Sequence, residues 1–101
     1  MATPGHTPGH ASYVVGDDGR CAVIVGDAMH NPMEADVEIA FAFDDDRPRA
    51  RAAREALGAR GALPHTVLAG CHFPDLVFGT VRPAGARLAI SFAPGQEWPL
   101  A

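Results

Sequence analysis

The chain opens with the stretch TPGHTPGH at residues 3–10 and continues into two apolar runs, residues 11–15 and 21–25. The sequence GDDG separates the two runs, and Gly26 and Asp27 directly follow the second. Short apolar runs bounded by glycine are typical of strands, so these segments predict a hairpin. The second run is continuously apolar, which favours a strand buried on both faces.

Length and composition restrict the class of protein. With 101 residues the chain forms at most one small domain, and a hydrophobic content of 48% argues against general disorder. The net charge is -4, and the basic residues form no stripe that would indicate a nucleic-acid partner. No apolar run is long enough to span a membrane. Met1 leads straight into proline and glycine, so we expect no signal peptide in this chain. A cytoplasmic location is the default, and export is not judged from this chain.

One helix is predicted from about residue 48 to residue 60. Three aspartates at 44–46 and Pro48 are typical of a helix start, because aspartate caps free amides and proline is tolerated in the first turn. We expect an apolar stripe on one side and a solvated face on the other. The stripe comprises Ala50, Ala53, Ala56 and Leu57, and the solvated face comprises Arg49, Arg51, Arg54 and Arg60.

The remaining segments predict further extended structure. Residues 37–43 alternate in polarity, which fits a short strand or an extended segment laid over a core. Residues 66–69 form a third strand, and residues 77–82 and 87–92 form a closing hairpin. Together these elements predict an α/β chain with mostly antiparallel strands.

Three residues could contribute to a metal site: His6, Asp27 and His72. Imidazole nitrogen and carboxylate oxygen are both good zinc ligands. The three residues lie in loops next to separate strands, and loops at one end of a sheet can converge. Taken singly, each has a simpler interpretation as a surface histidine or a turn aspartate, because single-motif matches are often false.

Four features follow one another along the chain: TPGHTPGH, a hairpin, Gly26-Asp27, and GCHF at residues 70–73. In this order they resemble the second half of a metallo-β-lactamase-fold hydrolase. Further details are similar to the methyl parathion hydrolase and lactonase-like branch. They are GDAMH at residues 26–30, the acidic run at 44–46, the Arg/Ala helix and HFP at 72–74. The resemblance implies the C-terminal half of a four-layer αββα sandwich over residues 1–93, followed by a tail at 94–101.

The resemblance also implies roles for the site residues. His6 and His72 would each hold one of two zinc ions, and Asp27 would bridge the ions and orient the nucleophile. Other divalent metals are compatible with these ligands. A hydroxide held by the ions would attack a small-molecule ester, lactone or phosphotriester. His30 occupies a position where related lactonases carry a substrate-facing tyrosine, so it is either a catalytic residue that contacts substrate or an exposed loop histidine.

The motif His-x-His-x-Asp-His, which supplies the other ligands in the family, is absent from this chain. We therefore expect the chain alone not to be a competent hydrolase. It would be completed by a separately supplied N-terminal half or by a second copy of itself. The alternatives are a non-catalytic metal-binding or interaction module, as a homodimer for example, and a small structural domain.

Overall fold

The chain forms one helix and a five-stranded sheet, seen in a computed structural model that describes residues 1–17, 19–36, 38–73, 78–85 and 87–91. The strands follow chain order across the sheet: β1 (Tyr13–Asp17), β2 (Arg20–Ile24), β3 (Thr66–Ala69), β4 (Phe78–Ala84) and β5 (Arg87–Ser91). Only the β2–β3 pair is parallel. The α/β class with mostly antiparallel strands is thus confirmed, and the predicted tail at 94–101 lies outside the described residues.

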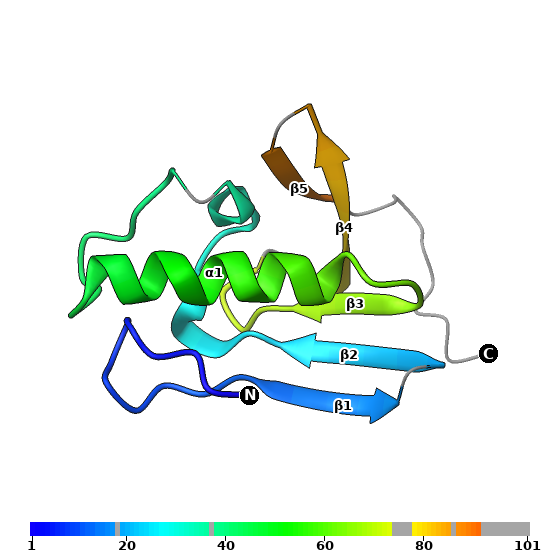
Figure 1. Ribbon diagram of the computed structural model, residues 1–101, viewed down its shortest axis with the longest axis horizontal. Coiled ribbons are helices and arrows are strands. Elements are labelled where there is room, and N and C mark those ends of the chain that lie inside the picture. The colour runs from blue at the N-terminus through cyan, green and yellow to red at the C-terminus, as the bar shows by residue number, and fades with distance from the viewer. Residues whose placement is uncertain (18, 37, 74–77, 86, 92–101) are drawn as a thin grey trace.

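The parallel β2–β3 pair requires a long connection, and this connection carries most of the candidate site. It contains the short 3-10 helices η1 (Gly26–Ala28) and η2 (Pro32–Ala35) and the helix α1 (Arg47–Gly61). Figure 1 shows α1 lying along one face of the sheet, with the segment before β1 near its N-terminal end. No described helix is long and apolar enough to cross a bilayer.

α1 begins as the sequence indicates. The Asp46 side chain caps the helix by accepting from the backbone N–H of Arg49, and Pro48 lies in the first turn. Residues 38–43, all described, form no strand, so of the two alternatives for this segment the strand is wrong.

Two residues of α1 face the opposite way from the prediction. Ala56, assigned to the apolar stripe, is exposed, whereas Arg54, assigned to the solvated face, is buried. The cause is Asp44, whose carboxylate pairs with the Arg54 guanidinium and compensates its charge below the surface. Helical periodicity could not reveal this pair, because Asp44 lies outside the helix.

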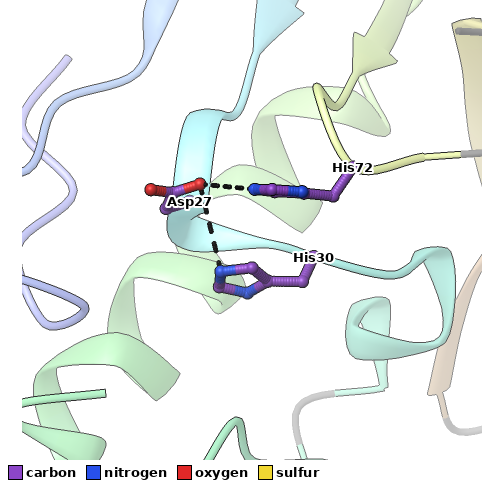
Figure 2. A group of neighbouring side chains, drawn as sticks. All are labelled: Asp27, His30 and His72. Atoms are coloured by element: carbon purple, nitrogen blue, oxygen red, sulfur yellow. Dashed lines mark hydrogen bonds and ion pairs between the residues drawn. The ribbon is translucent and has the colours of Figure 1, made fainter. Parts of the chain in front are cut away.

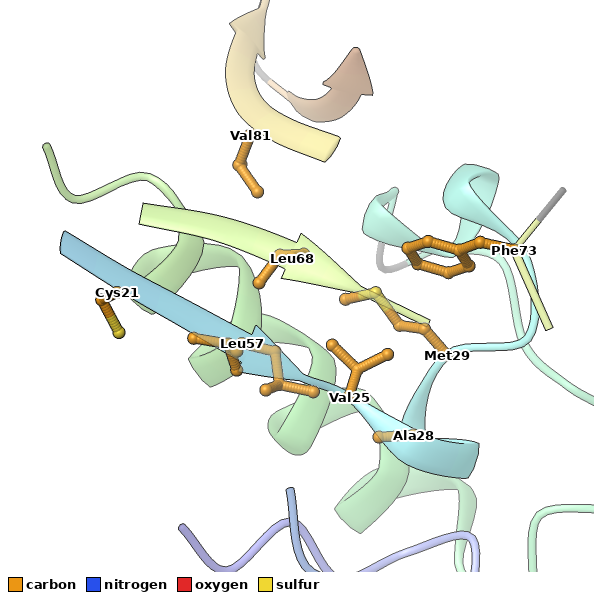
Figure 3. Close-up of a cluster of buried hydrophobic side chains, with 9 residues drawn as sticks. Cys21, Val25, Ala28, Met29, Leu57, Leu68, Phe73 and Val81 are labelled. Carbon is orange, nitrogen blue, oxygen red and sulfur yellow. The ribbon is translucent and has the colours of Figure 1, made fainter. Parts of the chain in front are cut away.

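The hydrophobic core lies between α1 and one face of the sheet. Figure 3 shows the side chains that form it, including Val25 and Met29 after β2 and Phe73 after β3. Val23 and Leu68 are opposite each other on β2 and β3, and both are fully buried together with Leu57 of α1.

The other face of the sheet has no such cover in the described chain. Strand register puts Tyr13 beside Ile24, Ile24 beside Ala69, and Ala69 beside Phe78, so these side chains share one face. Tyr13 is 74% exposed, Ile24 39% and Phe78 38%. The expectation that β2 is buried on both faces is therefore wrong, because the described helices cover one side of the sheet.

Candidate metal centre

The first loop is fixed against the N-terminus of α1. The backbone N–H groups of Asp45 and Asp46 donate to the carbonyl oxygens of His6 and Gly5, at 3.2 and 2.9 Å. Gly5 has φ +142°, and a Cβ on it would lie 2.1 Å from the backbone nitrogen of Ala50. Only glycine fits this approach, so the close packing of loop and helix determines where His6 lies.

The His6 ring lies between two carboxylates. Its Nδ1 is 3.0 Å from Oδ1 of Asp44, and its Nε2 is 3.7 Å from Oδ2 of Asp27. An ionised carboxylate only accepts hydrogen bonds, so the contact with Asp44 places a proton on Nδ1 and leaves Nε2 as the nitrogen that faces Asp27. This is the arrangement in which a histidine ligates a metal while a carboxylate orients it.

His10 fixes the backbone at Asp27. Its Nε2 accepts from the Asp27 N–H at 3.0 Å, so the ring proton must be on Nδ1, which lies 3.2 Å from the Thr3 carbonyl oxygen. With Nε2 occupied in this way, His10 positions the loop and does not ligate.

Asp27 presents its two carboxylate oxygens to different partners. Oδ2 faces His6, whereas Oδ1 is 2.9 Å from Nε2 of His72 and 3.9 Å from Nε2 of His30. Figure 2 shows both rings directed at the Asp27 carboxylate. The hydrogen bond from His72 lowers the pKa of Asp27, and the charged forms of the three histidines add to this effect against a partial loss of hydration. The carboxylate is therefore favoured in its ionised, metal-ligating form.

The His30 ring is held by stacking. Its centroid lies 3.8 Å from that of Phe41 with an interplanar angle of 17°, and 5.1 Å from that of His72. Its Nδ1 is directed toward the buried carboxylate of Glu34, 3.8 Å from Oε1. Glu34 in turn accepts from the backbone N–H groups of His30 and Asn31.

The structure brings together His6, Asp27, His30 and His72, the residues singled out from the sequence. Sequence reasoning missed the residues that surround them: Glu34, Phe41, Asp44 and Arg54. A signal existed for Glu34, because Asn31 and Glu34 have capping-box spacing and do form a capping box at η2. Asp44 gave no separate signal, because in the sequence it belongs to the acidic run that indicates the start of the helix.

The donor set fits a divalent ion. One nitrogen each of His30 and His72 and one oxygen of Asp27 lie within 4.8 Å of one another. His6 approaches the same carboxylate through its other oxygen. Imidazole and carboxylate donors of this kind suit zinc and other first-row divalent metals.

Residues 1–72 match the sequence profile of the metallo-β-lactamase superfamily. The chain belongs to this superfamily. The predicted resemblance is confirmed at that level, and the match ends at His72, the last of the proposed ligands.

Two solved structures resemble the chain over 93% of its length. One is the hydrolase AbOPH, with 29% identity and a TM-score of 0.77. The other is AidC, a dizinc quorum-quenching lactonase solved with N-hexnoyl-L-homoserine, with 21% identity and a TM-score of 0.78. The chain spans 34% of the length of each. No curated protein matches it in sequence.

Proposed function

We propose that this chain is the metal-binding part of a metal-dependent hydrolase, similar to the methyl parathion hydrolase and lactonase-like branch of its superfamily. The proposal rests on one observation: the two carboxylate oxygens of Asp27 contact different histidines, Oδ2 facing His6 and Oδ1 facing His72. A carboxylate flanked in this way can bridge two ions, one on each side. We assign His6, Asp27 and His72 as ligands.

The chain's own residues would prepare this site before any metal binds. Asp44 accepts from Nδ1 of His6 and so directs Nε2 toward Asp27, and His10 fixes the backbone of Asp27. Two bound zinc ions would supply an acidified water and an electrophile for the scissile group. His30, next to Asp27, is proposed to lie within reach of a bound substrate.

The proposed substrates are small-molecule esters, lactones or phosphotriesters. The lactone class is supported by AidC, a lactonase crystallised with an acyl-homoserine product. At 21% identity AidC is evidence for a common fold, so its substrate is a starting point for assays of this chain.

A complete site would need ligands beyond this chain. The motif His-x-His-x-Asp-His does not occur in its sequence, and the chain spans about a third of its solved neighbours (34%). An N-terminal half of the fold would supply the missing ligands and cover the exposed sheet face that contains Tyr13 and Ile24.

A fusion protein tests the proposal. The part of AbOPH outside the match would be joined to this chain, and hydrolysis of a lactone, an aryl ester and an aryl phosphotriester would be measured with added zinc. We expect activity in the fusion, none in its Asp27→Asn variant and none in the isolated chain. A folded, zinc-loaded fusion inactive on all three substrates would contradict the proposed reaction class.

A second candidate function is a non-catalytic interaction module, such as a homodimer. The observation that favours it is the apolar sheet face, where Tyr13 is 74% exposed. Monomers have few contiguous apolar patches of this kind. Sedimentation analysis and the fusion assay together distinguish the two, because a stable dimer of the chain whose fusion is inactive supports the module and opposes the hydrolase.

A further inference from the structure

His30 has the surroundings of a metal ligand. Its Nε2 faces Oδ1 of Asp27, the same oxygen that contacts His72, and its Nδ1 faces the buried carboxylate of Glu34. We propose that His30, Asp27 and His72 together hold one divalent ion within this chain, and that Glu34 orients the His30 ring. This inference rests on the proposed function only because both require an ion at Asp27. It replaces the proposed role of His30 as a substrate contact with that of a metal ligand.

The separations between donor atoms suit such an ion. Ligand atoms about 2.1 Å from a tetrahedral zinc lie about 3.4 Å from one another. The two separations at Oδ1 of Asp27 are 2.9 Å to His72 and 3.9 Å to His30, one below and one above this value. Shifts of about half an ångström, within the range of ordinary side-chain motion, would bring both donors to coordinating distance.

The environment of the His30 ring repeats that of His6. The Nδ1 atom of each histidine faces a buried carboxylate, Asp44 for His6 and Glu34 for His30, and Nε2 faces Asp27. Metal-ligating histidines commonly direct their second nitrogen to a carboxylate, which fixes the ring and its tautomer. Within the described part of the chain, His30 Nδ1 is buried and has no hydrogen-bond partner, at 3.8 Å from Glu34 Oε1. A small rotation on metal binding would complete that hydrogen bond.

The ring is also restrained before an ion binds. Phe41 stacks on one side of it and His72 lies 5.1 Å from its centroid. Stacking alone would explain an aromatic side chain here, but it would not explain why both ring nitrogens face carboxylates. Preorganisation of this kind lowers the entropy lost when the ion is captured.

The consequence is a three-donor set that needs nothing from outside the chain. Two imidazoles and one carboxylate leave a fourth tetrahedral position for water. On the opposite side of Asp27, His6 and Oδ2 offer only two donors. The isolated chain should therefore bind one ion per molecule, on the side of His30.

Zinc titration of the full chain, followed by calorimetry and by ¹⁵N NMR of the histidine rings, tests the inference. We expect one zinc per chain and a shift of the Nε2 resonances of His30 and His72. His30→Phe keeps the stack on Phe41 but removes the donor, and should weaken binding at least about 100-fold. Glu34→Gln keeps the acceptor for the backbone amides and should weaken it about 10–100-fold. His65→Asn, at an exposed turn, and Glu38→Gln are the matched controls and should bind as the unaltered chain does.

The outcomes separate the two proposals. If Asp27→Asn and His72→Phe lose zinc while His30→Phe binds normally, His30 is not a ligand and the proposed function stands. If the unaltered chain binds no zinc, the inference is overturned, whereas the proposed function is judged by the activity of the fusion. The NMR measurement needs no substitution, so an unshifted His30 Nε2 in the zinc-loaded chain contradicts the inference even if the variants fail to fold.

Discussion

Arg54 and Asp44 form a buried ion pair, and Asp44 also contacts the His6 ring. Nη1 of Arg54 lies 3.5 Å from Oδ2 of Asp44, and the two side chains are 2% and 4% exposed. The other oxygen of the same carboxylate is 3.0 Å from Nδ1 of His6. The pair therefore connects the packing of α1 to the orientation of a proposed ligand, and its effects on stability and on the site can be separated.

Removing one partner of this pair should be costly. Arg54→Met leaves Asp44 buried with only His6 to compensate its charge, and breaking a buried pair in this way costs about 3–5 kcal/mol. Urea unfolding monitored by circular dichroism measures the loss. Arg51→Met is the control, because Arg51 pairs with Glu38 and Glu55 at the surface. Exposed pairs contribute about 0–1 kcal/mol, so equal losses in the two variants would refute a special role for Arg54.

Removing both partners should restore stability but not the orientation of His6. In Asp44→Leu with Arg54→Met, apolar side chains replace the buried charges, which is often neutral or stabilising. His6 then loses the acceptor that holds the proton on Nδ1. Long-range ¹H–¹⁵N NMR should show the Nδ1–H tautomer in the unaltered chain and a mixture in the double variant. A ring that keeps its tautomer in the double variant would mean that Asp44 does not position it.

Gly5 and Gly9 provide a matched pair in the first loop. Gly5→Ala requires an unfavourable φ of +142° and a Cβ 2.1 Å from the Ala50 backbone, whereas a Cβ on Gly9 meets nothing within 4 Å. We expect Gly5→Ala to displace the loop and lower the unfolding free energy by at least about 2 kcal/mol, in the range of strained backbone positions. Gly9→Ala should change it by less than about 0.5 kcal/mol. Thermal unfolding of both variants measures the difference, and similar melting temperatures would contradict the loop packing described here.

Local patterns were sufficient to predict the five strands and the helix α1, but not how their faces are used. The hairpin, the helix start at Asp46 and the strand at Thr66 follow from turn residues, capping and β-branched runs, which act over a few residues. The burial of Arg54 depends on Asp44, a partner that lies outside the helix and is recognised only in the fold. The exposure of Ile24 has a related cause, since an apolar run does not reveal whether a second layer is present.

The candidate site also shows this difference between what local sequence patterns reveal and what only the fold reveals. His6, Asp27 and His72 were predicted as ligands because histidine and aspartate lie next to strands in an order that resembles one superfamily, and His30 was singled out from the resemblance to lactonases. The carboxylates behind the histidine rings were not, because Asp44 and Glu34 each have a local explanation as helix-start or capping residues. A residue whose sequence context indicates helix capping can therefore also face a histidine ring, and this contact is seen only in the fold.

Substitution by threonine should destabilise two adjacent residues of β2 to different degrees. Val23 is fully buried under α1, whereas Ile24 points to the other face of the sheet and is 39% exposed. Val23→Thr buries a hydroxyl among apolar side chains and should cost about 1–3 kcal/mol in urea unfolding. Ile24→Thr should cost the isolated chain less, and together with Tyr13→Thr it should reduce self-association in sedimentation velocity, because both substitutions remove apolar area from one patch. In the AbOPH fusion, where a second layer would cover this face, Ile24→Thr should become as costly as Val23→Thr. If its cost is unchanged between the isolated chain and the fusion, the exposed face is not the surface that the rest of the fold covers.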